Sequence, residues 1–400
     1  MTGRPGALRG VAATVIAAGA LYTTIFTVPP LIAPVFHDQL GFSFAEAGLL
    51  MTVYLAAFAG VSLPAGMLAD RFGPARVMAA GLLLAGGASL LFPVRHDLGW
   101  FLLLRATVGA GTALLYTPGI ALVRSLLPPA KAHAGVGAFS VGLTCGITVA
   151  YFSVPRLERA LGWEWPFRIY GIAALTGIAL LALVPRRGWV GRGGALGNPL
   201  AGIGALLRNP MLALVSVALF LTMFALYGVL TYIQSFLGKD GNFSASGLSN
   251  SGLVIAAASI PASFVGGWLA DRLRRPAEVM AAFSLLSAEI ALLWVLPHDS
   301  GAALVVVGVI ASFTGSAAVV PLFTLPSLGV ATAEAGVATG LATTVGISGA
   351  ILSSYVGGWI IDRSGFGVAF LVFAIAAVAA VSTAPLIRAR LRAATAVEAT

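Results

Sequence analysis

The sequence predicts an all-α membrane protein in which twelve transmembrane helices form two pseudo-symmetric six-helix bundles. Hydrophobic residues make up 59% of the 400 positions and charged residues only 9%, whereas soluble domains are about one quarter charged. A spanning helix needs about 20 apolar residues, and the chain has enough of them for about twelve. Short motifs also recur at half the chain length. This composition excludes an ordinary soluble enzyme.

Twelve apolar segments follow one another between charged or turn-forming residues, and each is long enough to cross a bilayer. In the first half they cover residues 11–36, 45–69, 76–94, 99–123, 133–155 and 166–185. In the second half they cover residues 210–237, 247–270, 277–296, 301–326, 335–360 and 366–387. The expected domains are an N-terminal bundle (1–185), a basic cytoplasmic linker (186–209) and a C-terminal bundle with a short cytoplasmic tail (210–400).

The positive charges indicate how the chain is oriented. With a cytoplasmic N-terminus, sixteen of the 23 Lys and Arg residues fall on the cytoplasmic side, six fall outside, and Arg105 lies within a span. Cytoplasmic loops carry such an excess, so both termini are expected to be cytoplasmic. The compact spans rich in Ala, Gly and Leu favour the inner membrane of a bacterium. The net charge of +9 follows from this topology, and no nucleic acid partner is expected.

Motifs repeat between the two halves. Residues 66–71 (Gly-Met-Leu-Ala-Asp-Arg) end the second span, and residues 267–272 (Gly-Trp-Leu-Ala-Asp-Arg) end the eighth, 201 positions later. Two further pairs, around His96 and around Gly162, recur 202 and 203 positions later. A third copy of the motif, residues 358–363, ends the eleventh span on the opposite face. Parallel halves that each contain an inverted three-helix repeat are the layout of six-plus-six transporters.

These motifs resemble those of the major facilitator superfamily. Gly66-x-Leu68-Ala69-Asp70-Arg71-Phe72-Gly73-x-x-Arg76 is similar to the family's loop 2–3 signature, and residues 267–275 are its second-half counterpart. Arg105-x-x-x-Gly109-x-Gly111 resembles the family's second motif. The resemblance covers the whole chain and implies a monomeric twelve-helix transporter. It implies little about the substrate, and span 5 lacks the Gly-Pro pair that drug/proton antiporters carry.

The resemblance also implies a set of gating residues. They are Asp70, Arg71, Arg76, Asp271 and Arg272. Asp70 is expected to dock on the start of span 11 and Asp271 on the start of span 5, because a helix N-terminus attracts a carboxylate. Together they would latch the cytoplasmic side. The alternative is that these charges only set the membrane topology.

Several spans carry polar side chains at helical spacing, and in a bilayer such faces belong against protein or a water-filled cavity. The faces that the family places around its central path supply the candidate substrate-binding residues. These are Arg105, Tyr22, Phe26, Thr112, Tyr116, Tyr227 and Thr231. The alternative is hydrogen bonding between helices, worth about 0.6 kcal/mol or a little more per bond.

Arg105 is the deepest cation, about 9 Å below the outer surface if span 4 starts near Gly99. A guanidinium stays charged there and must be paired or hydrated. One expectation is a functional role, in which Arg105 holds an anionic group of the substrate or repels a proton from a coupling site. The other is a structural role, in which Arg105 bridges spans 4 and 1. The bridge would use carbonyls that the prolines of span 1 leave without donors. Those carbonyls belong to Ile25, Phe26 and Pro30.

Glu289 is the candidate coupling residue, because it is the acid deepest within a predicted span. It lies twelve residues past Ala277, which corresponds to about 18 Å. An intramembrane carboxylate is a functional candidate by default. The family places span 9 at the periphery, however, so a neutral, hydrogen-bonded Glu289 is the alternative to a proton carrier.

The sequence therefore predicts a secondary transporter that moves a small solute by rocker-switch alternating access with proton coupling. One intramembrane cation and hydroxyl-rich faces favour a small anion or a polar organic molecule. The alternatives are an uncoupled facilitator and a proton-driven drug or metabolite exporter. A membrane sensor or enzyme is a remote alternative, since no signalling domain and no catalytic constellation are visible.

No cofactor or metal is expected. The sequence contains no G-x-x-x-x-G-K-[ST] motif, so we expect that ATP does not drive transport. It has one cysteine, Cys145, and four scattered histidines, which do not have the spacing of a metal site. The expected partners are the small-molecule substrate, the proton and the lipid bilayer.

Overall fold

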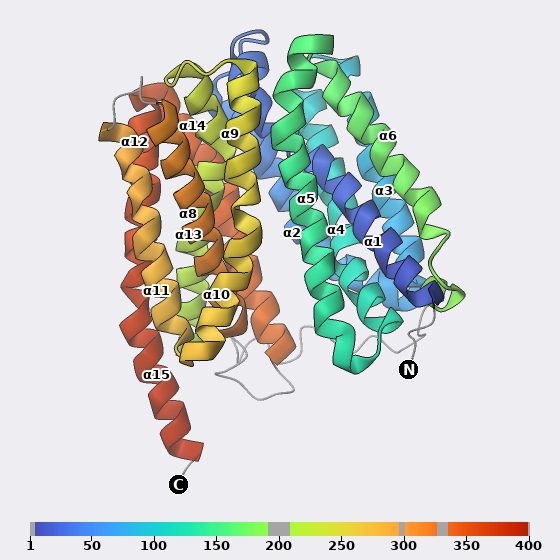
Figure 1. Cartoon of the computed structure of the whole chain (residues 1–400), viewed down its shortest axis with the longest axis vertical. Coiled ribbons are helices and arrows are strands. Elements are labelled where there is room, and N and C mark those ends of the chain that lie inside the picture. Colours follow the sequence, from blue (N-terminus) through green and yellow to red (C-terminus); the bar gives the residue numbers. More distant parts are fainter. Residues whose placement is uncertain (1–4, 191–208, 296–300, 326–334, 399–400) are drawn as a thin grey trace. The chain divides into compact units, whose positions relative to one another are not determined.

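The computed structural model describes residues 5–190, 209–295, 301–325 and 335–398, and no strand occurs among them. The chain divides into two compact units. Unit 1 contains Met1–Phe42, Leu49–Leu196 and Ser244–Leu253, and unit 2 contains Ser43–Gly48, Gly197–Phe243 and Val254–Thr400. In Figure 1 the first half of the chain runs from blue to green and the second from yellow-green to red. The start of the second predicted span therefore belongs to unit 2, and the start of the eighth belongs to unit 1.

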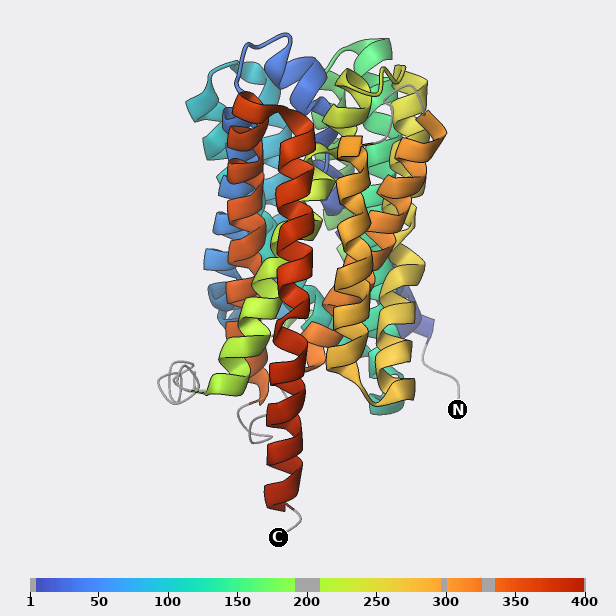
Figure 2. The same ribbon diagram turned by 90° about the vertical axis from the view of Figure 1, so that its left-hand side faces the viewer.

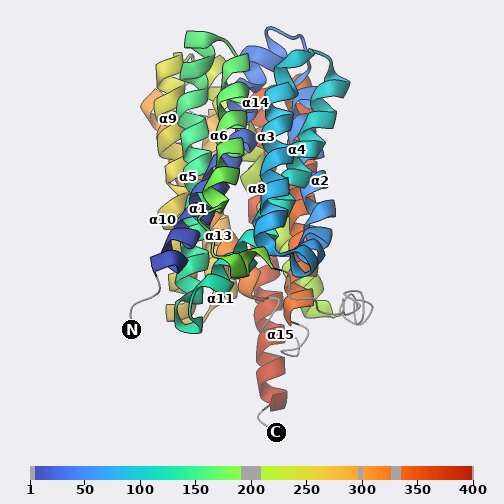
Figure 3. The same ribbon diagram turned by 90° about the vertical axis from the view of Figure 1, so that its right-hand side faces the viewer.

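Unit 1 is built from long helices. They are α1 (Pro5–Ile25), α2 (Phe44–Phe72), α3 (Pro74–Leu91), α4 (Leu98–Leu126), α5 (Pro129–Leu161) and α6 (Glu164–Leu181). Short 3-10 turns follow α3 at η3 (Phe92–Val94) and α6 at η4 (Arg186–Trp189). Helix α1 packs against α5 and α6, and α3 packs against α4 and α6 (Figure 3).

The first predicted span is not one continuous helix. Helix α1 ends at Ile25 and is followed by a 3-10 turn, η1 (Pro29–Leu31), and a π-helical turn, η2 (Ile32–His37). Pro29 and Pro30 have no N–H to donate to the preceding turn, and their rings clash with it, so an α-helix cannot continue through them. The prolines therefore explain where the regular helix stops.

Unit 2 contains the second set of helices. They are α8 (Pro210–Lys239), α9 (Ala245–Ala257), α10 (Ser259–Leu273), α11 (Pro276–Leu286), α12 (Leu292–Val295), α13 (Gly301–Thr324), α14 (Ala335–Val381) and α15 (Thr383–Glu398). The start of α9, up to Leu253, belongs to unit 1. Helix α8 packs against α14, and α13 packs against α10 and α11. The red helix α15 extends beyond the ends of its neighbours (Figure 2).

All twelve predicted spans fall on helices, although only nine helical segments of the described residues are long and apolar enough to cross a membrane by themselves. Helix α14 joins the predicted spans 11 and 12, with a kink at Gly365. The predicted span 6 corresponds to the short α6, and span 9 is interrupted by a 3-10 turn, η5 (Ser287–Ala291). The protein is thus an all-α membrane protein, and its helices are consistent with twelve spans.

The backbone repeats the symmetry that the motifs predicted. The described residues with positive φ form three pairs: Gly41 (74°) and Asn242 (52°), Gly73 (95°) and Arg274 (52°), and Gly162 (95°) and Gly365 (80°). The members of each pair are 201, 201 and 203 positions apart. Positive φ is sterically unfavourable for an L-residue, so such residues are rare. Their recurrence at the same spacing in both halves is therefore not expected by chance. The halves therefore share backbone geometry as well as motifs.

Candidate functional site

Arg105 is the most polar group in the interior of unit 1. Its side chain is 1% exposed and binds two other helices. Nη2 donates to the Ile25 carbonyl at 3.1 Å and Nη1 to that of Thr24 at 3.4 Å, both in α1. Nε donates to the Leu50 carbonyl of α2 at 3.2 Å. Arg105 therefore joins α4 to both α1 and α2.

The partners of Arg105 follow partly from local chemistry. In a regular helix the Ile25 carbonyl would accept from residue 29, but Pro29 has no N–H. The carbonyls of Phe26 and Pro30, which we also expected, are replaced by those of Thr24 and Leu50. The guanidinium also lies 4.9 Å from the centre of the Tyr54 ring.

Arg105 forms no ion pair with a carboxylate in the described part of the chain. The ion pairs found there join other residues, such as Arg95 and Asp97. Carbonyl dipoles and an aromatic face stabilise its charge without cancelling it. The interior of unit 1 therefore keeps an uncompensated positive charge.

The other candidate residues of unit 1 lie on α1, its extension and α4. Phe26 is buried with its ring 6.0 Å from that of Tyr151, and Tyr22 is half-buried. Thr112 is buried and donates to the carbonyl of Val108 in its own helix. Tyr116 is half-buried, with its ring 5.8 Å from the ring of Phe58. Of the α4 stripe, Tyr116 is therefore more accessible than Arg105 or Thr112.

Unit 2 carries the remaining candidates on α8. Tyr227 is half-buried, and Thr231 donates to its carbonyl at 2.7 Å. The Thr231 hydroxyl also lies 3.5 Å from that of Ser354 in α14. The neighbouring Tyr232 donates to the carbonyl of Ser354 and lies 3.3 Å from that of Phe44. Thr231 thus belongs to a buried polar contact between α8 and α14.

Gln234 is a candidate that the sequence analysis missed. It is 2% exposed, and neither its amide oxygen nor its amide nitrogen has a hydrogen-bond partner among the described residues. It continues the stripe of Tyr227 and Thr231 at helical spacing, which was the available signal. A buried amide without partners is costly, so this group is suited to a ligand or water.

Three of the expected gating residues lie at the end of α2 and the start of α3. Asp70, Arg71 and Arg76 are exposed, and Arg76 lies 3.5 Å from the Phe72 carbonyl. The expected partner of Asp70 borders residues 326–334, which lie outside the described residues. The side chain of Asp271 lies outside them as well. Arg272, the next residue of the motif, has its guanidinium 5.1 Å from the centre of the Trp268 ring. The cytoplasmic latch stays a prediction.

A carboxylate of the third motif copy does cap a helix. The two oxygens of Asp362 each accept a 2.8 Å hydrogen bond, one from the Phe44 N–H and one from the Ala45 N–H. These are the first amides of α2, where unpaired donors and the helix dipole attract an anion. This copy of the motif is visible in the sequence, but its pattern does not specify which helix Asp362 caps.

Glycines let α2 and α14 approach closely at this point. A Cβ on Gly358 would collide with the Phe44 carbonyl, and one on Gly48 with the Ser354 carbonyl. In unit 1 the start of α9 is held differently, by a 2.7 Å hydrogen bond from Arg156 to Asn250. The starts of α2 and α9 each belong to the unit formed mainly by the other half of the sequence. Each start is held there by a polar side chain, Asp362 for α2 and Arg156 for α9.

Replacing Asp362 by Ala is expected to speed hydrogen–deuterium exchange at the first turn of α2 by about tenfold or more. The reason is that each charge-assisted hydrogen bond contributes about 1.5–3 kcal/mol, and about 1.4 kcal/mol corresponds to tenfold. The start of α4 is the internal control, because Asp97 caps it at Trp100 within the same segment. Unchanged exchange at Phe44 and Ala45 would show that the cap contributes nothing in solution.

Glu289 lies where span 9 departs from the α-helix, in η5. It is half-buried, and its Oε1 lies 3.4 Å from the Thr314 hydroxyl of α13. Its Oε2 is buried and has no hydrogen-bond partner among the described residues. The hydroxyl of Ser287, two residues earlier, lies 3.1 Å from that of Thr314.

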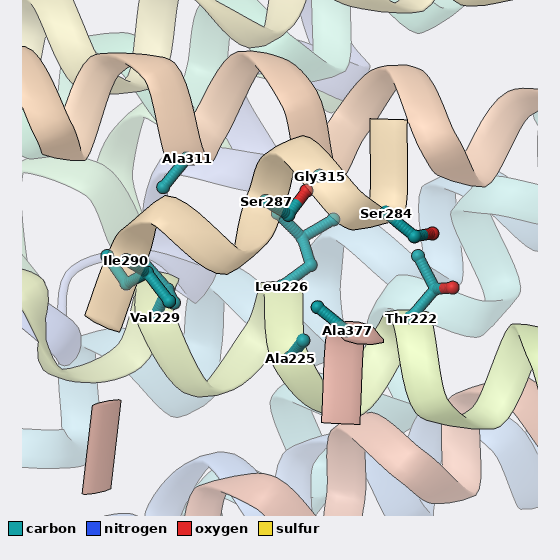
Figure 4. A pocket seen from close by; sticks show the side chains of 10 residues that line it. All are labelled: Thr222, Ala225, Leu226, Val229, Ser284, Ser287, Ile290, Ala311, Gly315 and Ala377. Carbon is teal, nitrogen blue, oxygen red and sulfur yellow. The ribbon is translucent and has the colours of Figure 1, made fainter. Parts of the chain in front are cut away.

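A small cavity adjoins these hydroxyls inside unit 2 (Figure 4). The side chains around it come from α8, α11, η5, α13 and α14, and the polar ones are Thr222, Ser284 and Ser287. The space open to the centre of a water molecule is about 20 Å³, which is enough for one water. The remaining wall is apolar.

No group of three or more His, Cys, Asp or Glu side chains suited to a metal occurs in the ranges that the structure describes. The charged groups described above are instead single residues on different helices. The arrangement can bind a small polar molecule, water or a proton, and nothing in it points to covalent chemistry.

Comparison with known proteins identifies the family. The sequence profile described as Major Facilitator Superfamily matches residues 14–354. A solved structure titled as a bacterial homolog of the human lysosomal transporter Spinster, in an inward-facing and occupied conformation, has a TM-score of 0.77. It covers 98% of this chain and 98% of that one at 18% identity. This likeness shows the fold.

Several curated relatives match parts of the chain. The puromycin resistance protein pur8 of Streptomyces alboniger is 33% identical over 48% of this chain and 39% of its own length. The multidrug resistance protein MdtL of Shewanella oneidensis is 34% identical over 38% and 37%. The probable L-galactonate transporter of Escherichia coli is 25% identical over 35% and 31%. The chain thus spans less than half the length of these relatives. Because the profile covers most of the sequence, the chain belongs to the Major Facilitator Superfamily of membrane transporters.

Proposed function

We propose that the protein is a secondary transporter that moves a small organic anion by alternating access, coupled to protons, in a bacterial inner membrane with both termini cytoplasmic. The observation that carries the substrate class is Arg105, a buried cation in unit 1 without a carboxylate partner among the described residues. An uncompensated charge in a low-dielectric interior attracts an anion over several ångströms. The name of one relative, a probable L-galactonate transporter, supports this choice.

The direct contacts to such an anion fall to residues other than Arg105. Four of its five N–H groups already face the carbonyls of α1 and α2 or the sulfur of Met51. We therefore propose that Arg105 supplies the electrostatic attraction, while the half-buried Tyr22 and Tyr116 of the same unit touch the substrate. The rocker-switch motion, the monomeric state and the domain boundary at the linker are part of the same proposal.

A second function is favoured by the other relatives. The names of two of them refer to puromycin resistance and multidrug resistance, which supports export of drug-like molecules. The missing Gly-Pro pair of span 5 argues against this alternative. An uncoupled facilitator is the third possibility.

Uptake into proteoliposomes tests all three. With an imposed proton gradient, the purified protein is expected to concentrate L-galactonate, and a protonophore should abolish the concentration. Puromycin movement without L-galactonate movement would favour the exporter. Equilibration that a protonophore does not affect would identify a facilitator. If the protein transports neither L-galactonate nor puromycin, the proposal is contradicted for sugar acids and for drugs of this kind.

Replacing Asp70 by Asn is expected to slow transport about fivefold while the protein still inserts into the membrane. The reason is that a carboxylate at a helix N-terminus contributes about 1 kcal/mol that an amide cannot supply, and this stabilisation would be lost from the closed cytoplasmic latch. The measurement is the initial uptake rate per inserted protein. Arg9→Gln, a charge change at an exposed residue outside the gating set, is the control, and wild-type uptake by Asp70→Asn would contradict the latch.

A further inference from the structure

We propose that Glu289 is a proton-binding site enclosed within unit 2, reached through the hydroxyls of Thr314 and Ser287 from the cavity beside them. The proposal rests on the proton coupling proposed above and assigns the coupling proton to a place in the fold. It separates the proton path, inside the helices of unit 2, from the substrate contacts proposed on α1 and α4 of unit 1.

The elements packed around Glu289 carry few charged groups. Turn η5 packs against α11, α12, α13 and α14, and the residues of α12 and α13 include no ionisable side chain. The acid of α11, Glu278, pairs with Arg388 at 3.2 Å. On α14, Asp362 caps α2 and Arg363 stacks on Trp359. The other titratable group on α14 is Tyr355, which is exposed.

No cation of these elements therefore pairs with Glu289. On α8, which also lines the cavity, Lys239 lies at the end of the helix over the Phe44 ring. An ionised carboxylate without a counter-ion is strongly unfavourable in an apolar interior. Glu289 is accordingly neutral in this arrangement and holds a proton.

The hydroxyls beside Glu289 have too few protons for all the hydrogen bonds open to them. Thr314 donates its single hydroxyl proton to the Ile310 carbonyl at 2.8 Å, and Ser287 donates its own to the Phe283 carbonyl at 2.8 Å. The same hydroxyl is placed to donate to Glu289 Oε1 at 3.4 Å, but one proton cannot fill both hydrogen bonds, and the bond to Ile310 is the shorter. A protonated carboxyl supplies the missing donor, whereas a carboxylate would oppose lone pair to lone pair.

A route from Thr314 to water runs through Ser287. The hydroxyl of Ser287 contacts that of Thr314, and Ser287 also lines the cavity, together with Ser284 and Thr222 (Figure 4). One water in the cavity can exchange a proton with Ser287. Release then proceeds by three transfers: Glu289 to Thr314, Thr314 to Ser287, and Ser287 to the water. Each hydroxyl gains one proton and loses one, and Glu289 is left as the carboxylate.

The break in span 9 fits this role. A 3-10 turn inside a helix often marks a functional hinge, and here it covers Ser287–Ala291, which includes both Ser287 and Glu289. A small change in this turn would alter the distance between the carboxyl and Thr314, and with it the ease of proton release.

Infrared difference spectroscopy of the purified protein during a pH titration tests the site without any substrate. We expect a protonated-carboxyl band at neutral pH that disappears on alkalinisation and is missing in Glu289→Gln. In Thr314→Val the band should shift to higher wavenumber, because the carboxyl loses its hydrogen-bond partner. Glu278→Gln, an acid at the surface end of α11, should leave the band unchanged. If Glu289→Gln does not fold, the shifts in Thr314→Val and Ser287→Ala decide the assignment.

Transport then tests the link to coupling. Glu289→Gln is expected to lose proton-driven uptake of L-galactonate by tenfold or more while retaining exchange of the same probe without a proton gradient. A spectrum identical to the wild type in Glu289→Gln would overturn the site. The expected band together with wild-type proton-driven uptake in the variant would overturn its coupling role. If the wild-type protein moves no probe, the proposed function fails, and the titration still decides the proton site.

Discussion

Replacing Arg105 by Ala is expected to lower the free energy of unfolding by several kcal/mol and to abolish transport. The change leaves the carbonyls of Thr24, Ile25 and Leu50 without their donor. A buried polar group that loses its partner costs about 1–3 kcal/mol, and the lost side-chain volume adds a cavity. Thermal unfolding in detergent, followed by intrinsic fluorescence, measures the effect.

Arg95→Ala is the matched control, because Arg95 is exposed, pairs with Asp97 and lies over the ring of Trp100 at the surface. Surface ion pairs contribute at most about 1 kcal/mol, so this variant should unfold close to the wild type. Equal unfolding temperatures for Arg105→Ala and Arg95→Ala would contradict the bridging role of Arg105.

Arg105→Lys separates the two roles of the charge. An ammonium keeps the charge but lacks the planar fork that reaches α1 and α2 together. If Arg105 attracts an anion, the Lys variant should unfold earlier than the wild type and still keep much of the L-galactonate transport. If both variants unfold earlier but bind L-galactonate as the wild type does, Arg105 only joins helices and the anion assignment is wrong.

The contacts of Arg105 show how far sequence reasoning reached. Its depth and the free carbonyl of Ile25 were predictable, because a helical rise and a missing proline N–H are local properties. The partner on α2, Leu50, was not, because a single sequence does not specify how α2 is rotated toward α4. Apolar faces of many rotations satisfy a bilayer equally well.

Asp362 shows the same limit at a larger distance. The motif copy around it was visible, but its partners Phe44 and Ala45 are 318 and 317 positions away. Any helix N-terminus offers the same unpaired N–H groups, so the chemistry predicted a capping role without indicating which helix. Gln234 was missed for another reason. The sequence of α8 does not show whether a buried amide has hydrogen-bond partners.

The break in span 9 was not predicted either. Residues 277–296 are apolar except at Glu278, Ser284, Ser287 and Glu289, and a hydropathy pattern reads such a segment as one helix. The turn at Ser287–Ala291 contains no proline or glycine, the residues that usually signal an interruption. The separate 3-10 turn therefore depends on packing against α13 and α14, which only the folded structure shows.

Gly73→Ala is expected to destabilise unit 1 by about 2–4 kcal/mol, more than any other change to a turn glycine in the described residues. Its φ of 95° and ψ of 136° are unfavourable for any residue with a Cβ, at about 1–3 kcal/mol. A Cβ there would also lie 2.6 Å from the carbonyl carbon and oxygen of Trp189. Backbone atoms cannot move aside as a flexible side chain can, so the strain and the collision add.

Gly41→Ala isolates the backbone strain alone. Gly41 has a φ of 74°, and an added Cβ would meet no atom within 4 Å. Its loss of stability should therefore stay near 1 kcal/mol, measured by thermal unfolding beside Gly73→Ala. Equal losses in the two variants would show that Trp189 yields easily and that the collision carries no cost.

The turn after the motif needs a glycine in the first half of the chain, at Gly73, but not in the second half. Arg274, 201 positions after Gly73, occupies the equivalent turn with a φ of 52°, which lies in the left-handed region that an L-residue can adopt at moderate cost. Gly73 lies outside that region because its loop packs directly on the backbone at Trp189 and Val190. Gly73→Ala should therefore also displace the neighbouring Asp70 and reduce transport, whereas Arg274→Gly should leave stability unchanged or raise it slightly.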